Sequence, residues 1–295
     1  MKFTIIIFLF SVLLSKNPIP DSTISFKGHK LDPLNMNIKN LISQDALRDA
    51  GMNFEFLSSI QIDSVKLAAK DYTPLAVSDS DIVIMETSKG IMKIKLFNDI
   101  APNHCLNFKK LANSGFYDGT TFHRVIPGFM IQGGDILSRD GVRYNDGRGN
   151  PGWTVNQEFN DIPHKRGILS MARGSNPNSG GSQFFICVGD APWLDKKYTV
   201  FGEVLEENTY IIDRIAKAPT DYSVGKISCV KNIPEGENPS DWVVVEDPKT
   251  NQKLYSKVPE GNQAASYKSK LQKDLRSDNP VSKVTIKKVR VVSND

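Results

Sequence analysis

The chain is poor in the residues that mark a disulfide-stapled or metal-binding protein. Its 295 residues include only three cysteines, Cys105, Cys187 and Cys229, and only four histidines. The cysteines are odd in number and no two are close enough for a C-x-x-C pair, and the apolar runs around Cys105 and Cys187 predict buried thiols. The histidines lack the spacing of metal ligands, so we expect no metal and no cofactor.

Net charge is also small. A value of +4 at pH 7, without a basic stripe, argues against nucleic acid as a partner. The 39% hydrophobic and 24% charged residues are ordinary for a globular protein with one large domain or two small ones.

One apolar run stands at the start of the chain. Residues 3–14 form a twelve-residue run between Lys2 and Ser15-Lys16, short of the roughly twenty residues that span a bilayer. This pattern predicts a signal peptide over residues 1–16 with a weak cleavage site, and hence a periplasmic or secreted protein without a stable membrane span. A buried N-terminal element and an uncleaved membrane tether stay open as alternatives.

The rest of the chain reads as an extension followed by a β-rich domain. Residues 17–80 are polar, with weak helical spacing at 45–57, and predict a flexible or partly helical extension. From residue 81 the apolar runs are short and β-rich, and we expect strands at 82–87, 91–97, 121–125, 130–133, 168–172, 184–188 and 199–204. Helices are expected from Pro102 to Gly115 and over 209–217. Many short strands with two helices indicate a mainly β, antiparallel barrel.

The most informative stretch runs from Phe122 to Asp135. Pro127-Gly128 sets a turn, after which alternate residues point to opposite sides of a strand, so that Met130 and Gln132 share one side. Three further blocks follow in order: Gly180-Gly181-Ser182-Gln183-Phe184-Phe185-Ile186-Cys187, Trp193-Leu194-Asp195 and Tyr198-Thr199-Val200-Phe201-Gly202.

Together these blocks resemble the cyclophilin family of peptidyl-prolyl cis-trans isomerases. The resemblance implies a closed eight-stranded antiparallel barrel with a helix over each end, spanning residues 81–292 and ending in a strand at 284–289. Residues 220–280 depart from the family pattern, and their hairpin signal at 242–246 and 253–258 and polar helix at 263–276 predict an inserted lobe before the last strand. We expect the lobe to lie against the barrel or a partner, and the pocket to be complete without it.

Rotation of an X-Pro bond is slow because it breaks amide resonance, with a barrier of about 18–20 kcal/mol. A catalyst must hold the proline ring in an apolar cup and place a hydrogen-bond donor near the twisted nitrogen, for which a guanidinium is well suited. The resemblance implies a catalytic role for Arg124, Phe129 and Gln132. It implies substrate binding by Met130, Ala172, Arg173, Gln183, Phe185, Trp193, Leu194 and Tyr198.

Two of these positions depart from the family pattern. Arg173 stands where many relatives carry Asn, and Tyr198 stands where many carry a His that lines the proline pocket. We therefore expect activity with altered substrate preference. Trp193 matches the rim indole that binds cyclosporin in sensitive members, and the two departures leave the strength of that binding open.

Two weaker motifs carry no chemistry. Residues 147–152 form a G-x-G-x-x-G pattern, but Pro151 and the following residues do not open a helix, so we expect a flexible loop beside the groove and no dinucleotide site. The G-G-S-Q context of Ser182 does not match the nucleophile elbow of a serine hydrolase.

The sequence thus predicts a monomeric isomerase that acts on proline-containing peptides and unfolded proteins during folding. Two alternatives stay open: a module that binds proline peptides with little turnover, and an assembly factor in which the lobe acts.

Overall fold

A computed structural model describes residues 24–26, 29–31 and 56–293. The chain divides into two compact units, Met1–Asn53 and Phe54–Asp295. In the first unit β1 (Ile24–Phe26) pairs antiparallel with β2 (His29–Leu31). The predicted signal peptide, and most of the weak helical spacing at 45–57, lie outside the described residues.

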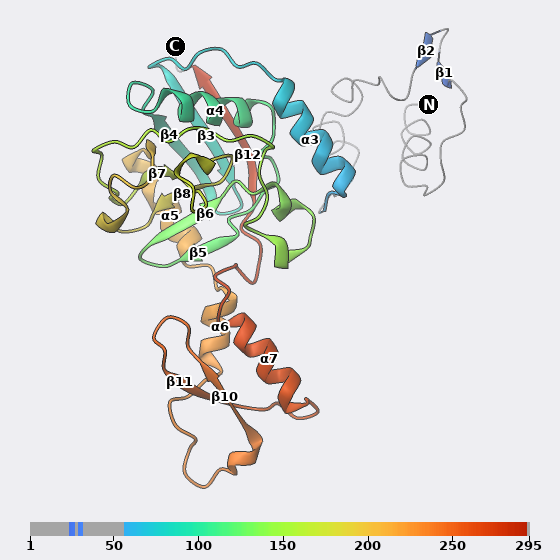
Figure 1. Cartoon of the computed structure of the whole chain (residues 1–295), viewed down its shortest axis with the longest axis vertical. Helices are drawn as coiled ribbons and strands as arrows, with labels where there is room; N and C mark the ends of the chain where they lie inside the picture. Colours follow the sequence, from blue (N-terminus) through green and yellow to red (C-terminus); the bar gives the residue numbers. More distant parts are fainter. Residues whose placement is uncertain (1–23, 27–28, 32–55, 294–295) are drawn as a thin grey trace. The chain divides into compact units, whose positions relative to one another are not determined.

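The second unit is built on one curled sheet of eight antiparallel strands (Figure 1). In spatial order these strands are β12 (Ile286–Ser293), β3 (Asp81–Thr87), β4 (Gly90–Leu96), β9 (Val200–Val204), β7 (Ile168–Met171), β8 (Phe184–Cys187), β6 (Met130–Gly133) and β5 (Arg124–Ile126). Each strand predicted outside residues 220–280 overlaps one of these, so the mainly β antiparallel fold is confirmed. The strand predicted at 121–125 begins later, because residue 121 makes only isolated bridges.

The closed barrel is not confirmed, since β12 and β5 form the two edges of the sheet. The residues that precede β5 and those that precede β12 are joined by only scattered main-chain hydrogen bonds. In one of them the N–H of Phe122 donates to the carbonyl of Val284 at 2.9 Å. Along β5 itself, the Val125 N–H donates to the carbonyl of Asp278 at 2.9 Å. The main chain at residue 278 therefore bonds to the exposed edge of β5, where a strand that closed the barrel would pair.

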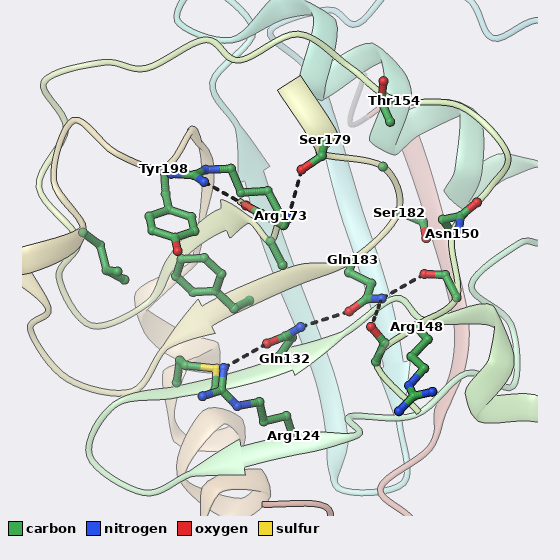
Figure 2. Close-up of a pocket in the computed structure, with 18 of the residues that line it drawn as sticks. Arg124, Gln132, Arg148, Asn150, Thr154, Arg173, Ser179, Ser182, Gln183 and Tyr198 are labelled. Carbon is green, nitrogen blue, oxygen red and sulfur yellow. Dashed lines mark hydrogen bonds between the residues drawn. The ribbon is translucent and has the colours of Figure 1, made fainter. Parts of the chain in front are cut away.

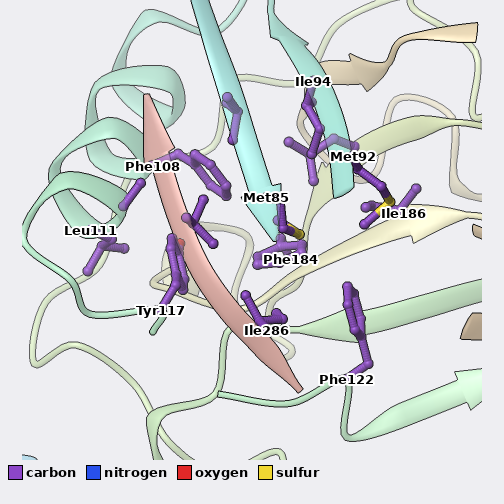
Figure 3. Packing of buried hydrophobic residues seen from close by; sticks show 14 of the residues in the cluster. Met85, Met92, Ile94, Phe108, Leu111, Tyr117, Phe122, Phe184, Ile186 and Ile286 are labelled. Atoms are coloured by element: carbon purple, nitrogen blue, oxygen red, sulfur yellow. The ribbon is translucent and has the colours of Figure 1, made fainter. Parts of the chain in front are cut away.

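Both predicted helices are present. α4 (Pro102–Asn113) begins with proline in its first turn, where a missing N–H costs no hydrogen bond, and buries Phe108 and Leu111. α5 (Thr209–Ala216) buries three isoleucines. Figure 3 shows the core between α4 and the sheet, where Phe108 and Tyr117 meet Phe184.

A third helix, α3 (Ser59–Asp71), lies in the region predicted to be an extension. Its start follows a capping box in which Ser58 and Gln61 satisfy each other's main-chain N–H groups, a signal readable from S-x-x-Q. The short 3-10 helices are η2 (Ile136–Arg139), η3 (Arg143–Asn145), η4 (Pro177–Ser179), η5 (Pro192–Leu194), η6 (Glu206–Asn208) and η7 (Pro239–Asp241).

Between α5 and β12 the chain forms a lobe over residues 220–280 with its own sheet. It contains α6 (Asp221–Ile227), β10 (Trp242–Glu246), β11 (Lys253–Lys257) and α7 (Ala264–Asp274), of which only α6 was not predicted. Val245, Leu254, Leu271 and Leu275 form a separate small core. Among the described residues, no helix has both the length and the apolar character needed to cross a membrane.

Candidate active site

A cavity of about 400 Å³ opens on the β5, β6 and β8 side of the sheet. Ten of the eleven predicted site residues line it: Arg124, Phe129, Met130, Gln132, Ala172, Arg173, Gln183, Phe185, Leu194 and Tyr198. The eleventh, Trp193, is 56% exposed and lies outside the lining, with its ring centroid 5.5 Å from that of Phe129. The structure brings the predicted residues together, while their individual roles stay predictions.

A tight turn sets the relation between β5 and β6. The N–H of Phe129 donates to the carbonyl of Ile126 at 3.0 Å, with Pro127 and Gly128 in the two central positions. Gly128 has φ +75°, a left-handed conformation that costs glycine little. This turn pairs Ile126 with Met130 and therefore places Arg124 directly opposite Gln132.

The polar side of the cavity is a chain of hydrogen bonds (Figure 2). Arg124 Nη1 donates to Gln132 Oε1 at 3.4 Å, and Gln132 Nε2 donates to Gln183 Oε1 at 3.0 Å. Gln183 Nε2 in turn donates to the carbonyls of Gly147 and Gly149 at 2.9 and 2.8 Å. The guanidinium is thus tied to the loop at residues 147–152, which lies beside the groove as the sequence predicted.

The other side of the cavity is apolar. Met130 and Phe185 are buried there with Leu194, and Phe129 and Tyr198 pack against them. The rings of Phe185 and Tyr198 meet edge to face, with centroids 5.8 Å apart. These residues form an apolar cup with aromatic walls.

Arg173 does not extend freely into the groove. Its guanidinium lies 4.5 Å from the ring centroid of Tyr198 (Figure 2). It also donates to the carbonyl of Lys197 at 2.8 Å. The two departures from the family pattern therefore contact each other.

The main-chain N–H of Ala172 donates to the carbonyl of Gln183 at 3.0 Å, which holds β7 and β8 together at the groove.

Beneath the apolar cup lies a residue that the sequence analysis did not select. The imidazole of His164 stacks on Phe185, and its two nitrogens contact Asp195 Oδ1 at 2.9 Å and Ser170 Oγ at 3.0 Å. Burial lowers the pKa of His164, although the hydrogen bond to Asp195 opposes the shift. Burial thus favours the neutral ring, which packs under Phe185. Nothing in the local sequence of His164 marks it for this position.

Arg148, Asn150, Thr154 and Ser179 extend the cavity away from the apolar cup (Figure 2). Arg148 and Asn150 belong to the loop that was predicted beside the groove, although neither was selected as a site residue. No signal in the sequence placed Thr154 and Ser179. Within the described part of the chain, no cluster of His, Cys, Asp and Glu is arranged to hold a metal ion.

Comparison with known proteins identifies the family of this chain. The sequence pattern of the family described as cyclophilin type peptidyl-prolyl cis-trans isomerase/CLD matches residues 82–235, which include every lining residue of the cavity. The chain belongs to the cyclophilin-type peptidyl-prolyl cis-trans isomerases. The predicted activity, isomerisation of X-Pro bonds, is confirmed.

Relatives agree with this assignment. A peptidyl-prolyl cis-trans isomerase of Synechococcus elongatus is 47% identical over 131 residues, which are 44% of this chain and 85% of the relative. The peptidyl-prolyl cis-trans isomerase-like 1 of Rhizopus delemar is 41% identical over 49% of this chain and 86% of its own length. The crystal structure of a cyclophilin type isomerase of Cryptosporidium parvum matches with a TM-score of 0.50 at 26% identity, over 73% of this chain and 99% of that one.

Proposed function

We propose that the cavity rotates X-Pro bonds without forming a covalent intermediate, with Arg124 as the catalytic donor. The observation that carries the proposal is that the guanidinium of Arg124, bound to Gln132, lines the same cavity as the apolar cup. The cup made by Phe129, Met130, Phe185 and Leu194 holds the proline ring. Gln132 holds the guanidinium and meets the peptide main chain.

The electrostatic reason is a change at the proline nitrogen. As the amide twists, resonance is lost and the nitrogen gains a lone pair that can accept a hydrogen bond. A donor that is fixed in advance and always charged stabilises this twisted state more than either planar form. Each 1.4 kcal/mol of such preference accelerates the reaction about tenfold.

The test is the variant Arg124→Ala, assayed by isomerisation of a short proline peptide. We expect loss of most of the turnover with an unchanged circular dichroism spectrum. Arg214→Ala on α5, outside the cavity lining, is the matched control and keeps full activity. Full activity of the Arg124 variant would disprove this mechanism. Wild-type protein that binds the peptide without accelerating its isomerisation would favour the alternative of a binding module.

We also propose that the natural substrates are proline-containing segments of unfolded proteins. The cavity is open to solvent beside Arg124, whose side chain is 48% exposed. An internal segment of a long polypeptide can therefore reach the cavity without a free chain end. Acceleration of a proline-limited refolding reaction would support this proposal. Its absence, in a sample active on short peptides, would contradict it.

Cyclosporin is a further proposed ligand. The exposed indole of Trp193 beside Phe129 supports it, whereas the Arg173–Tyr198 contact changes the neighbouring wall. We expect inhibition by cyclosporin that strengthens in the double variant R173N/Y198H. No inhibition of either protein would contradict the proposal.

We propose that residues 220–280 are an insertion into the family fold ahead of β12, which forms one edge of the sheet. The family match ends at residue 235, and β12 then returns to pair with β3. Export to the periplasm or medium, supported by the apolar run at 3–14, and a monomeric state are proposed from the sequence alone. Cell fractionation and light scattering test them, and a cytosolic full-length product or a stable oligomer would contradict them.

A further inference from the structure

Arg124 has a second neighbour, the charged Asp278, which lies at the C-terminal end of the lobe, beside β5. The carboxylate Oδ2 of Asp278 lies 3.9 Å from Arg124 Nε, on the other edge of the guanidinium from Gln132. The Asp278 side chain is only 14% exposed, whereas that of Arg124 is 48% exposed. The guanidinium of Arg124 therefore lies between an amide and a carboxylate.

The main chain fixes the position of this carboxylate. The carbonyl of Asp278 accepts the N–H of Val125, the residue after Arg124, at 2.9 Å. One residue thus contacts β5 through its backbone and Arg124 through its side chain. A contact anchored in this way needs less ordering of side chains than an ion pair between two long surface residues, for which the entropy loss offsets much of the attraction.

A lysine of the lobe holds the other oxygen of the same carboxylate. Lys249 Nζ lies 2.7 Å from Asp278 Oδ1 and 3.7 Å from the ring centroid of Tyr222. Because the closer cation is Lys249, the carboxylate stays at ion-pair distance from Arg124 without a direct hydrogen bond. A direct pair would draw the guanidinium off Gln132 and compete with the substrate for its donors.

We propose that Asp278 is a positioning residue for Arg124, and that Lys249 sets the distance at which it acts. This inference rests on the proposed role of Arg124 and extends it to the lobe, which the sequence analysis had placed outside the pocket. The lobe then contributes to the rate of isomerisation without touching the proline peptide.

The first test is Asp278→Asn, which keeps the size of the side chain and its main-chain bond to Val125 but removes the charge. We expect the isomerisation rate at saturating peptide to fall about two- to fivefold, the range for a partly exposed ion pair, with peptide affinity little changed. Both quantities are measured by NMR exchange on one proline peptide. The Nε–H resonance of Arg124, assigned by its loss in R124A, shifts in D278N.

The second test is Lys249→Met, which frees the carboxylate to pair directly with Arg124. We expect a slower rate here as well. The double variant D278N/K249M is expected to be no slower than D278N alone, because Lys249 acts through Asp278. Additive losses would show that Lys249 acts by another route and would overturn that half of the proposal.

The control is Asp274→Asn on α7, which breaks a similar carboxylate–lysine pair, Asp274 with Lys270 at 2.6 Å, outside the cavity. It should leave both the rate and the Arg124 resonance unchanged. An unchanged or faster rate in D278N, or an equal loss in D274N, overturns the proposal. If R124A itself keeps full activity, the proposed function fails instead, and the two failures are therefore distinguishable.

Discussion

The ring of Phe185 stacks on the imidazole of His164, with centroids 6.0 Å apart and 16° between the planes. The floor of the apolar cup therefore rests on a titratable residue that is itself fully buried. A second buried histidine, His104 on α4, contacts Glu158 through Nδ1 at 2.5 Å. Burial lowers the pKa of both imidazoles, although their carboxylate partners oppose the shift.

The lowered pKa values of these two histidines predict that the folded protein becomes less stable as the pH falls. An unfolded histidine takes up a proton near pH 6.5, whereas the folded pKa lies lower, so the unfolded state binds more protons in between. Their contribution to the free energy of unfolding is complete above about pH 6.5. It is lost as the pH falls below this value, by at most about 1.4 kcal/mol per pH unit for each histidine. Melting temperatures between pH 7.5 and 5.0 measure this effect. His164→Gln should flatten the slope, and an unchanged slope would contradict the assignment.

Gln132→Ala should slow turnover because it removes the acceptor for Arg124 Nη1 and the link to Gln183. We expect the rate to fall about three- to tenfold, equivalent to about 0.7–1.4 kcal/mol, which is the range for a typical hydrogen bond because this one is long, at 3.4 Å. Gln252→Ala, between β10 and β11, is the control and should leave the rate unchanged. Equal rates for the two variants would show that Gln132 does not position Arg124.

Gly128→Ala should destabilise the β5–β6 turn. An added Cβ would meet no atom within 4 Å, so the cost comes from the backbone at φ +75°, about 1–2 kcal/mol of unfolding free energy. Gly225→Ala in α6 is a control of opposite sign, because its Cβ would make ordinary contacts at 3.4–3.6 Å and alanine favours a helix. Urea unfolding measures both, and a loss in the second variant as large as in the first would contradict the explanation.

The thiols should differ sharply in reactivity. Burial raises the pKa of Cys105 and of Cys187 to about 12, while Cys229 is half-buried and its pKa is raised by burial as well. At pH 8 only about one thiol in ten thousand would be ionised at the first two sites. Titration with a disulfide reagent should give one slow thiol in the folded protein and three after denaturation. Rapid reaction of three thiols in the folded state would refute this prediction.

Much of the site could be predicted because it depends on local geometry. The turn at Pro127-Gly128 sets the register of β5 on β6, and that register alone places Arg124 opposite Gln132. Period-two alternation likewise places Met130 on the same side of the strand as Gln132, and the family resemblance assigns that side to the pocket. The hairpin of the lobe and the helix after it followed from the same short-range signals.

The strands, the turns and the family could therefore be predicted from the residues alone, together with ten of the residues that line the cavity. The two edges of the sheet, the packing of His164 under Phe185 and the contact of Asp278 with Arg124 became visible only in the folded chain. The difference lies in the range of the forces involved. Hydrogen bonds of a turn or a helix join neighbours in the chain and leave a readable period. Contacts such as Arg124–Asp278 join segments far apart in sequence, and their geometry exists only after the core has packed and fixed both backbones.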